Sequence, residues 1–296
     1  MPAGCNVQRA ATEQRSPRSP LHGLSRRDFV RTSTAAVLGL GWAGCRVPRP
    51  LDRIGVQLYT VRRAMEQDFS GTLARVAEIG YREVEFAGYF GRNPAGVRAA
   101  LDAAGLAAPA AHVPFEALRE GWDEVLDAAN RIGHRYVVVA WIPEQERRTL
   151  DAYRAMGELF NRAGEAARTA GLTYAYHNHD FEFAPLEGQV PYDVLLAETD
   201  PALVGLELDL FWITKGGRDP LAYFDRHPGR FPMLHVKDMN AAGEMVDVGQ
   251  GTIDFRGIFA RSDQAGVRHY FVEHDEPSDP FASIRASHDY LRSLGR

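Results

Sequence analysis

The residues best suited to chemistry begin with two histidines, His177 and His179, inside the segment Tyr174–Phe183. The segment reads as a β-strand, and side chains two residues apart on a strand point to the same face. Two imidazoles at one spot can ligate a metal ion or act as an acid/base pair. Three later apolar runs each end near another residue that can ligate a metal ion or carry a proton, so all of them could lie in one site. These residues are Asp209, His235 and Glu273.

The elements that would position these residues alternate along the chain from Ile54 onward. A short β-branched or aromatic run is followed by a loop and then by an amphipathic segment rich in Ala, Arg, Glu and Leu. The predicted strands are Ile54–Tyr59, Glu83–Phe86, Ala107–His112, Tyr136–Trp141, Leu172–His179, Val204–Asp209, Phe231–Val236 and Arg268–Glu273. The predicted helices are Phe69–Ile79, Ala95–Ala104, Phe115–Ile132, Glu146–Ala170, Tyr192–Glu198, Pro220–Asp225, Phe255–Ser262 and Pro280–Leu294.

Eight such units in about 245 residues predict a (β/α)₈ TIM barrel, a single α/β domain over residues 54–296. The rival architecture is a doubly wound open sheet, which usually has a Gly-rich phosphate turn after its first strand. Here Leu58–Arg62 follows that strand and contains no glycine. Glycines recur instead where helices should end, at Gly80, Gly105, Gly133, Gly171 and Gly266.

Polar residues gather at the C-terminal ends of the predicted strands, where barrels of this kind build their active sites. They are Gln57, Tyr59, Glu83, Glu85, His112, Trp141, His177, His179, Glu207, Asp209, His235, Lys237, Glu273 and Asp275. Acids that face a barrel interior are costly to bury without a compensating cation, metal ion or water. A mixed nitrogen and oxygen set suits Mn²⁺, Zn²⁺ or Co²⁺ better than Ca²⁺. We therefore predict a metal site made of His177, Asp209, His235 and Glu273.

Lys237 follows the predicted ligand His235 by two residues, and the chain has only one other lysine, Lys215, against 32 arginines. Its ammonium group could orient a substrate oxygen or stabilise an enolate. The alternative is a salt bridge to Asp238 or another nearby acid.

The first 45 residues read as a twin-arginine signal peptide. Arg26-Arg27-Asp28-Phe29 precedes a small, apolar stretch, Thr34–Gly44, that is too short to span a bilayer. The alternative is a buried N-terminal helix. Trp42–Cys45 resembles a lipoprotein cleavage box, so Cys45 is a candidate for acylation. We expect twin-arginine export to a periplasmic or other exported location, membrane attachment only through a lipid on Cys45, and a short linker over residues 46–53.

Charge and cysteine content restrict the function further. Both cysteines, Cys5 and Cys45, lie in the predicted leader, so the mature chain can form no internal disulfide. The leader carries six arginines and two acids, a net +4, which changes the charge from −5 for the whole chain to −9 for the remainder. An acidic balance argues against a nucleic-acid-binding surface.

Several short segments of the mature region match one known family. They are Gly55–Arg62, Ala111–Pro114, Tyr176–Asp180, Gly205–Trp212, Leu234–Asp238, Asp247–Phe255 and Phe271–Asp275. On these segments the chain resembles the xylose-isomerase-like barrels of the sugar phosphate isomerase/epimerase family, from Ile54 to its end. Ketose epimerases of that family hold a divalent metal with Glu, Asp, His and Glu from strands five to eight.

In this chain the last three of those ligands fall on Asp209, His235 and Glu273, but His177 stands in place of the first glutamate. The replacement puts the two-glutamate epimerase mechanism in doubt. His-x-His on strand five instead resembles the inosose dehydratase branch, which eliminates water from a keto-cyclitol. Family enzymes that act on 3-keto-glycosides by β-elimination are a further possibility.

The resemblance implies a keto-sugar or keto-glycoside as substrate and a metal-bound enediolate as the shared intermediate. The expected export favours a non-phosphorylated substrate, because sugar phosphates are largely cytoplasmic. Mn²⁺ is favoured, with Zn²⁺, Co²⁺ and Mg²⁺ as alternatives. His179, Glu273 and Lys237 are the predicted catalytic residues. The residues predicted to hold the sugar are Tyr59, Glu85, His112, Trp141 and Glu182. The function expected first is a sugar isomerase or epimerase; the alternatives are a lyase and a non-catalytic sugar-binding barrel.

Overall fold

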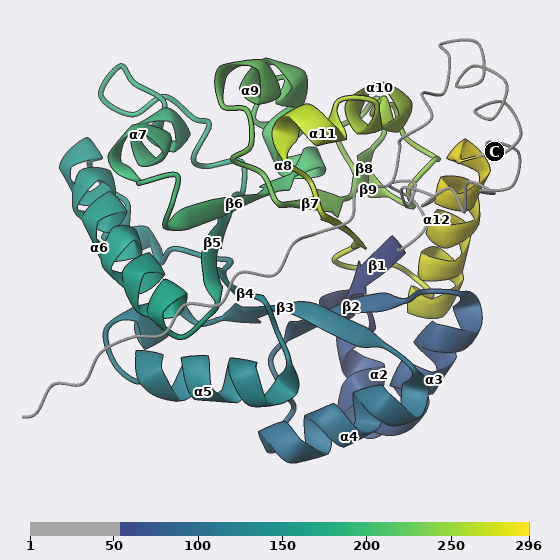
Figure 1. The fold of residues 1–296 in the computed structure, drawn as a ribbon. Helices are drawn as coiled ribbons and strands as arrows, with labels where there is room; N and C mark the ends of the chain where they lie inside the picture. Colours follow the sequence, from purple (N-terminus) through teal and green to yellow (C-terminus); the bar gives the residue numbers. More distant parts are fainter. Residues whose placement is uncertain (1–53, 296) are drawn as a thin grey trace, which may run out of the picture. The chain divides into compact units, whose positions relative to one another are not determined.

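The computed structural model of the protein describes residues 54–295. Within them eight parallel strands close into a barrel, which confirms the predicted (β/α)₈ fold (Figure 1). Around the barrel the strands follow the order β1-β10-β7-β6-β5-β4-β3-β2. Their bounds are β1 Ile54–Gln57, β2 Glu83–Ala87, β3 Ala107–Val113, β4 Tyr136–Val139, β5 Thr173–His177, β6 Val204–Asp209, β7 Met233–Val236 and β10 His269–Val272. A short antiparallel hairpin, β8 Asp238–Met239 and β9 Met245–Val246, follows β7.

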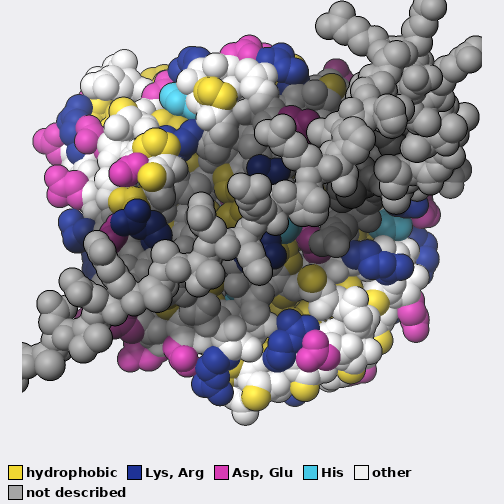
Figure 2. Space-filling view, in the orientation of Figure 1, with side chains coloured by type: hydrophobic (Ala, Val, Ile, Leu, Met, Phe, Trp, Pro, Cys, Tyr) yellow, Lys and Arg dark blue, Asp and Glu magenta, His cyan; other side chains and the backbone are white. Residues whose placement is uncertain are grey.

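The predicted signal peptide over residues 1–45, the lipidation at Cys45 and the linker over residues 46–53 lie outside the described residues. Among residues 54–295, none of the helices combines the length and the apolar character needed to cross a bilayer. Basic and acidic side chains are interleaved over the described part of the face shown in Figure 2.

Helices surround the strands on the outside of the barrel (Figure 1). They are α2 Arg62–Gln67, α3 Phe69–Ile79, α4 Pro94–Ala104, α5 Trp122–Ile132, α6 Leu150–Thr169, α7 Pro191–Glu198, α8 Leu210–Lys215, α9 Pro220–Arg226, α10 Phe255–Phe259, α11 Ser262–Ala265 and α12 Pro280–Leu294. Three 3₁₀ turns complete the described elements: η2 Leu58–Val61, η3 Phe115–Leu118 and η4 Glu144–Glu146.

Several predicted elements differ from the structure in their bounds, and two of these differences have clear local reasons. The helix predicted over Phe115–Ile132 is divided into η3 and α5, because Gly121 between them adopts a left-handed conformation with φ 87°. Strand β5 ends at His177 rather than His179. The backbone N–H of His179 donates to the carboxylate of Glu182 at 2.8 Å, so His179 belongs to the loop after the strand. The argument that placed both histidines on one strand face is therefore wrong.

The barrel interior is apolar at one level and polar at the next. Its small apolar cluster consists of Ala110, Val138, Ala175, Met233 and Phe271. Side chains two residues apart on a strand share a face, so the inward residue that follows lies closer to the C-terminal end of the barrel. On four of these strands that residue is polar: His112, His177, His235 and Glu273. The polar level therefore lies where a barrel builds its site.

Gly55 on β1 makes room for the largest side chain of this interior cluster. A Cβ atom at Gly55 would lie 2.6 Å from Cδ1 of Phe271 on the neighbouring strand β10. Any larger residue at position 55 would push this ring aside.

Candidate active site

A cavity of about 570 Å³ opens where the strands end. Loops after several strands contribute its lining, as expected for the C-terminal face of a barrel. The lining residues are Tyr59, Ala87, His112, Ala140, Trp141, His177, His179, Asp180, Trp212, Lys215, Lys237, Glu273 and Asp275. This volume is in the range of pockets that bind small molecules.

The four residues predicted as metal ligands meet beside this cavity, and each is buried. His177 and Glu273 also line the cavity. Nε2 of His177 lies 3.2 Å from Oδ2 of Asp209. Nδ1 of His235 lies 2.8 Å from Oε2 of Glu273 and 3.8 Å from Oδ2 of Asp209. One ligand atom from each of the four lies within 4.8 Å of all the others. The grouping predicted from the sequence is therefore present in the fold.

This donor set fits a divalent metal ion. Two imidazoles and two carboxylates form a mixed nitrogen and oxygen set of the kind that binds Mn²⁺, Zn²⁺ or Co²⁺. Nδ1 of His177 is buried and has no hydrogen-bond partner among the described residues. Buried polar atoms without partners are rare unless a ligand or water satisfies them. His177, Asp209, His235 and Glu273 would hold the ion.

Lys237 lies against the same carboxylates. Its Nζ is 2.7 Å from Oε2 of Glu273, 3.2 Å from Oδ2 of Asp209 and 2.9 Å from Oδ1 of Asp275. The lysine is itself buried. Lys237 therefore forms salt bridges, though with Asp209, Glu273 and Asp275 and not with its neighbour Asp238. It also lines the cavity, so a role in binding or stabilising a substrate remains a prediction.

Asp209 owes its position to the junction of β6 and α8. It ends the strand and caps the helix, where its Oδ1 accepts the backbone N–H of Trp212 at 2.9 Å. Its own backbone N–H donates to Oδ1 of the buried Asn178 at 3.0 Å. Sequence reasoning missed Asn178 and Trp212 as supports of the site. The N-cap pattern of Asp followed by an apolar helix start was the available signal for Trp212.

His179 lies in an aromatic environment beside the ligands. The centroid of its ring lies 4.8 Å from that of Trp141, 5.6 Å from that of Phe181 and 5.3 Å from that of Trp212. Burial first, and then the neighbouring His177 and Lys237, hold the pKa of His179 well below its ordinary value of 6.5. Its Nδ1 is buried without a partner among the described residues. A neutral imidazole with a free ring nitrogen can accept a proton.

A second buried cluster lies beside the first and shares His235 with it. It consists of Glu85, His112, Glu207 and His235. Nε2 of His112 lies 2.7 Å from Oε2 of Glu207 and 3.2 Å from Oε2 of Glu85. Burial alone would lower the pKa of His112, but the carboxylates of Glu85 and Glu207 raise it to about 9.

Three of the five residues predicted to hold the substrate line the cavity: Tyr59, His112 and Trp141. Tyr59 and Trp141 are 39% and 49% exposed, so each presents part of its surface to a ligand in the cavity. Glu85 and Glu182 are fully buried and do not line the cavity. Their expected role is corrected accordingly: each supports a histidine of the site, Glu85 through the His235 ring and Glu182 through the backbone of His179. Trp212, Lys215 and Asp275 line the cavity without having been assigned a role from the sequence.

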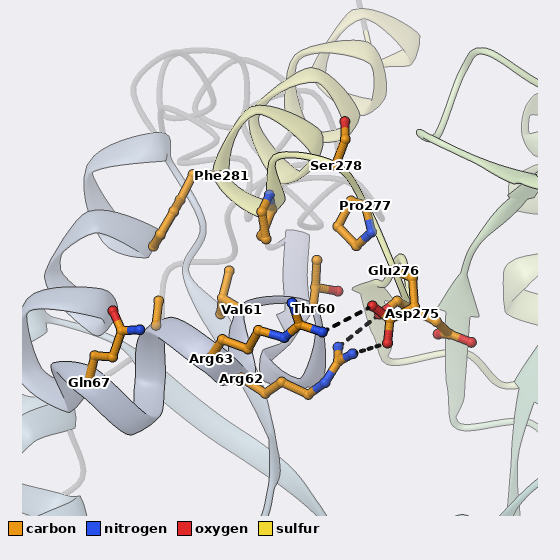
Figure 3. Close-up of a pocket in the computed structure, with 12 residues that line it drawn as sticks. Thr60, Val61, Arg62, Arg63, Gln67, Asp275, Glu276, Pro277, Ser278 and Phe281 are labelled. Carbon is orange, nitrogen blue, oxygen red and sulfur yellow. Dashed lines mark hydrogen bonds and ion pairs between the residues drawn. The ribbon is translucent and has the colours of Figure 1, made fainter.

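A smaller cavity of about 260 Å³ adjoins the first and shares Asp275 with it. Figure 3 shows Arg62 and Arg63 extending toward Glu276 across it. The guanidinium of Arg62 also lies 3.9 Å from the centroid of the Tyr59 ring, which lines the larger cavity. This stacked pair forms part of the wall between the two cavities.

Known proteins resemble the chain in both sequence and structure. An inosose dehydratase from Geobacillus thermodenitrificans is 24% identical over 77% of this chain and 90% of its own length. An inosose dehydratase from Lacticaseibacillus casei is 22% identical over 76% of this chain and 89% of its own. The crystal structure of a sugar phosphate isomerase/epimerase from Parabacteroides distasonis superposes with a TM-score of 0.74 and 27% identity, over 85% of this chain and 96% of that one.

The family profile described as the xylose isomerase-like TIM barrel matches residues 73–294. That match covers seven of the eight barrel strands and both candidate clusters. The chain therefore belongs to the xylose isomerase-like TIM barrel family.

Proposed function

We propose that the protein is a divalent-metal-dependent sugar isomerase/epimerase or lyase that removes the proton beside the ketone of a keto-sugar. The observation that carries this proposal is the convergence of His177, Asp209, His235 and Glu273 below a cavity that also exposes His179. Relatives that span most of the chain are sugar isomerase/epimerase or inosose dehydratase proteins, which supports the reaction class.

The first step, removal of the proton beside the ketone, needs a group that makes this C–H more acidic and a base that accepts the proton. A bound divalent ion would polarise the ketone and lower the pKa of the neighbouring C–H. Neutral His179 accepts that proton, and the substrate becomes an enediolate. Lys237 lies near enough to the same floor to stabilise the negative charge that develops on oxygen. Tyr59 and Trp141 hold the apolar face of the sugar at the mouth of the cavity.

Elimination is the favoured fate of the enediolate. Reprotonation on the opposite face, as in an epimerase, needs a second proton carrier. Glu273, the family's second carrier, is engaged by Lys237 at 2.7 Å and His235 at 2.8 Å. A single base is sufficient for elimination, because protonated His179 can return its proton to the departing oxygen as the C–O bond breaks. The inosose dehydratase relatives favour this outcome as well.

Isomerisation or epimerisation is the second candidate. The Parabacteroides distasonis relative, a sugar phosphate isomerase/epimerase, supports it with the higher identity of 27%. Single-base isomerisation is also chemically open to His179, since the same imidazole can return the proton to the adjacent carbon.

The proposed substrate is a non-phosphorylated keto-sugar, keto-cyclitol or 3-keto-glycoside. The proposal depends on export by the twin-arginine route, because sugar phosphates are largely cytoplasmic.

One experiment separates these outcomes. The Mn²⁺-loaded protein is incubated in D₂O with a panel of ketoses, keto-cyclitols and 3-keto-glycosides. An unsaturated or cleaved product identifies a lyase. An isomer or epimer, or deuterium in the recovered ketose without any elimination product, identifies an isomerase or epimerase. Replacing His179 with Ala should lower the rate about 10²-fold or more. The matched change at His227, which follows α9 and belongs neither to the candidate clusters nor to the cavity lining, should not. Full activity in the His179→Ala variant would exclude His179 as the base, and an inert wild-type protein across the panel would favour a sugar-binding barrel.

A further inference from the structure

We infer that Glu85, itself fixed by Gln57, is a positioning residue that holds the imidazole of His235 with Nδ1 directed at the candidate metal centre. This inference rests on the proposed metal site and assigns a role to the second cluster. Glu85 reaches His235 across the barrel interior, since β2 and β7 are not neighbours in the sheet.

The two nitrogens of His235 face different groups. Nδ1 lies 2.8 Å from Oε2 of Glu273, within the candidate metal centre. Nε2 lies 2.6 Å from Oε2 of Glu85 and 3.2 Å from Oε2 of Glu207. Both nitrogens therefore face carboxylates, and each can donate to one of them when no ion is bound. An ion beside Glu273 would replace the proton on Nδ1, while the bond from Nε2 to Glu85 keeps the ring in the orientation that presents Nδ1 to the ion.

Glu85 cannot turn away from His235 without losing other bonds. Its Oε2 accepts the side-chain amide of Gln57 at 2.8 Å and lies 3.2 Å from Nε2 of His112. Gln57 lies on the adjacent strand β1, where it is paired in register with Glu85. The Oε1 atom of Gln57 accepts the backbone N–H of Tyr59 at 3.1 Å. Both side chains are fully buried. The carboxylate is thus fixed by the barrel itself and not by solvent or substrate.

The alternative role for this cluster is a second metal site. Four of its contacts between nitrogen and carboxylate oxygen lie between 2.6 and 3.2 Å, which are hydrogen-bond lengths. Oε2 of Glu85 already has three nitrogen neighbours. An ion at this oxygen would have to displace them. The three nitrogen neighbours of this oxygen therefore favour a hydrogen-bonded support over a second ion.

Glu83 provides a matched control for Glu85. It lies two residues earlier on β2, is buried as well, and its Oε2 is 2.7 Å from Nδ1 of His269. The two glutamates therefore share a strand, a degree of burial and a histidine partner. They differ in that the partner of Glu83 belongs to neither candidate metal cluster.

The test compares Glu85→Gln with Glu83→Gln in the full chain. Mn²⁺ and Zn²⁺ affinities are measured by competition with a chelator, and bound ions are counted by elemental analysis. We expect Glu85→Gln to weaken binding about tenfold and Glu83→Gln to leave it unchanged. Gln57→Leu, which releases Glu85 without altering its charge, should weaken binding in the same direction by a smaller factor. Equal affinity in wild type, Glu85→Gln and Gln57→Leu would overturn the inference, as would two tightly bound ions per wild-type chain.

A second readout is independent of metal binding. In metal-free protein, ¹⁵N spectra of the histidine rings report which nitrogen of His235 carries the proton. Wild type should show a proton on Nε2, with or without a second proton on Nδ1, and Glu85→Gln should shift the Nε2 signal while the His269 signal stays. If wild type binds no ion but shows this signature, the proposed function fails and the positioning role stands. A proton found on Nδ1 alone would refute the positioning role whether or not the ion binds.

Discussion

The carboxylate of Asp209 joins the candidate metal centre to the start of helix α8. Its Oδ1 accepts the backbone N–H of Trp212 at 2.9 Å, while its Oδ2 lies 3.2 Å from Nε2 of His177. Oδ1 therefore stabilises the start of the helix, and Oδ2 faces the candidate metal centre. Replacing the residue can separate these two contributions.

We expect Asp209→Asn to lose metal binding while the helix remains capped. Asn is as good an N-cap as Asp, so the helix start should remain capped, and any loss of stability should come from Lys237, which keeps two of its three carboxylate partners. A neutral amide is a much weaker ligand, and Mn²⁺ affinity should fall about 10²-fold. Asp219 caps α9 by accepting the backbone N–H of Leu221 at 2.9 Å, which makes Asp219→Asn the control. Metal titration and thermal unfolding of both variants check the prediction, and unchanged affinity in Asp209→Asn would contradict it.

Lys237 should stabilise the metal-free protein more than the metal-loaded one. Its ammonium lies within 3.2 Å of three carboxylates, and removing one partner of a buried ion pair typically costs about 3–5 kcal/mol. We expect Lys237→Gln to lower the free energy of unfolding by an amount of this order in chelator, and added Mn²⁺ to restore part of it. Lys215 is exposed and forms no carboxylate pair among the described residues. Lys215→Gln should therefore change stability by less than about 0.5 kcal/mol. Equal losses with and without Mn²⁺ would show that the ion does not share these carboxylates.

The buried carboxyl of Glu182 should make stability fall as pH rises. Burial raises its pKa from the ordinary value of 4.5 to about 7, against the opposing hydrogen bonds from Tyr176 and the His179 backbone. The folded state therefore binds this proton more tightly than the unfolded state. The contribution of Glu182 to the free energy of unfolding is most favourable below pH 4.5 and is lost as the pH rises to about 7. The loss amounts to about 3 kcal/mol in all.

The matched variant for this prediction is Glu182→Gln. It should flatten the decrease in the free energy of unfolding between pH 4.5 and 7, as measured by urea titration at each pH. Glu83→Gln serves as the control, since its carboxylate is paired with His269 in another part of the barrel. An identical pH dependence in wild type and Glu182→Gln would show that Glu182 does not titrate in this range.

Much of the barrel could be predicted because its strands are short apolar runs and its helices end at glycines. The bounds of α3 and α12 were predicted to the residue. The short helix α8 was missed, because its apolar sequence Leu210–Lys215 follows β6 directly and shows no helical period over so few residues. Sequence periodicity also does not show how deeply a side chain is buried or which side chains surround it. It showed that Glu85 faces inward but not that Gln57, His112 and His235 enclose it.

The candidate ligands were easier to predict than the residues around them. Asp209, His235 and Glu273 lie within one residue of the ends of β6, β7 and β10, where strand order alone brings them together. Placing His179 depends on the conformation of the loop after β5. The backbone of His179 is held by a hydrogen bond to Glu182 that no strand pattern shows. Contacts made through loops depend on side-chain packing across the whole site.

The central claim is that His177, Asp209, His235 and Glu273 hold one divalent ion on which proton removal depends. The most direct test titrates metal-free full chain with Mn²⁺ while following both bound ion and the rate of proton removal from a reactive keto-sugar of the panel. We predict that both saturate together at one ion per chain, and that His177→Ala abolishes both. Full activity in the metal-free protein, or saturation of activity without bound ion, would contradict the account.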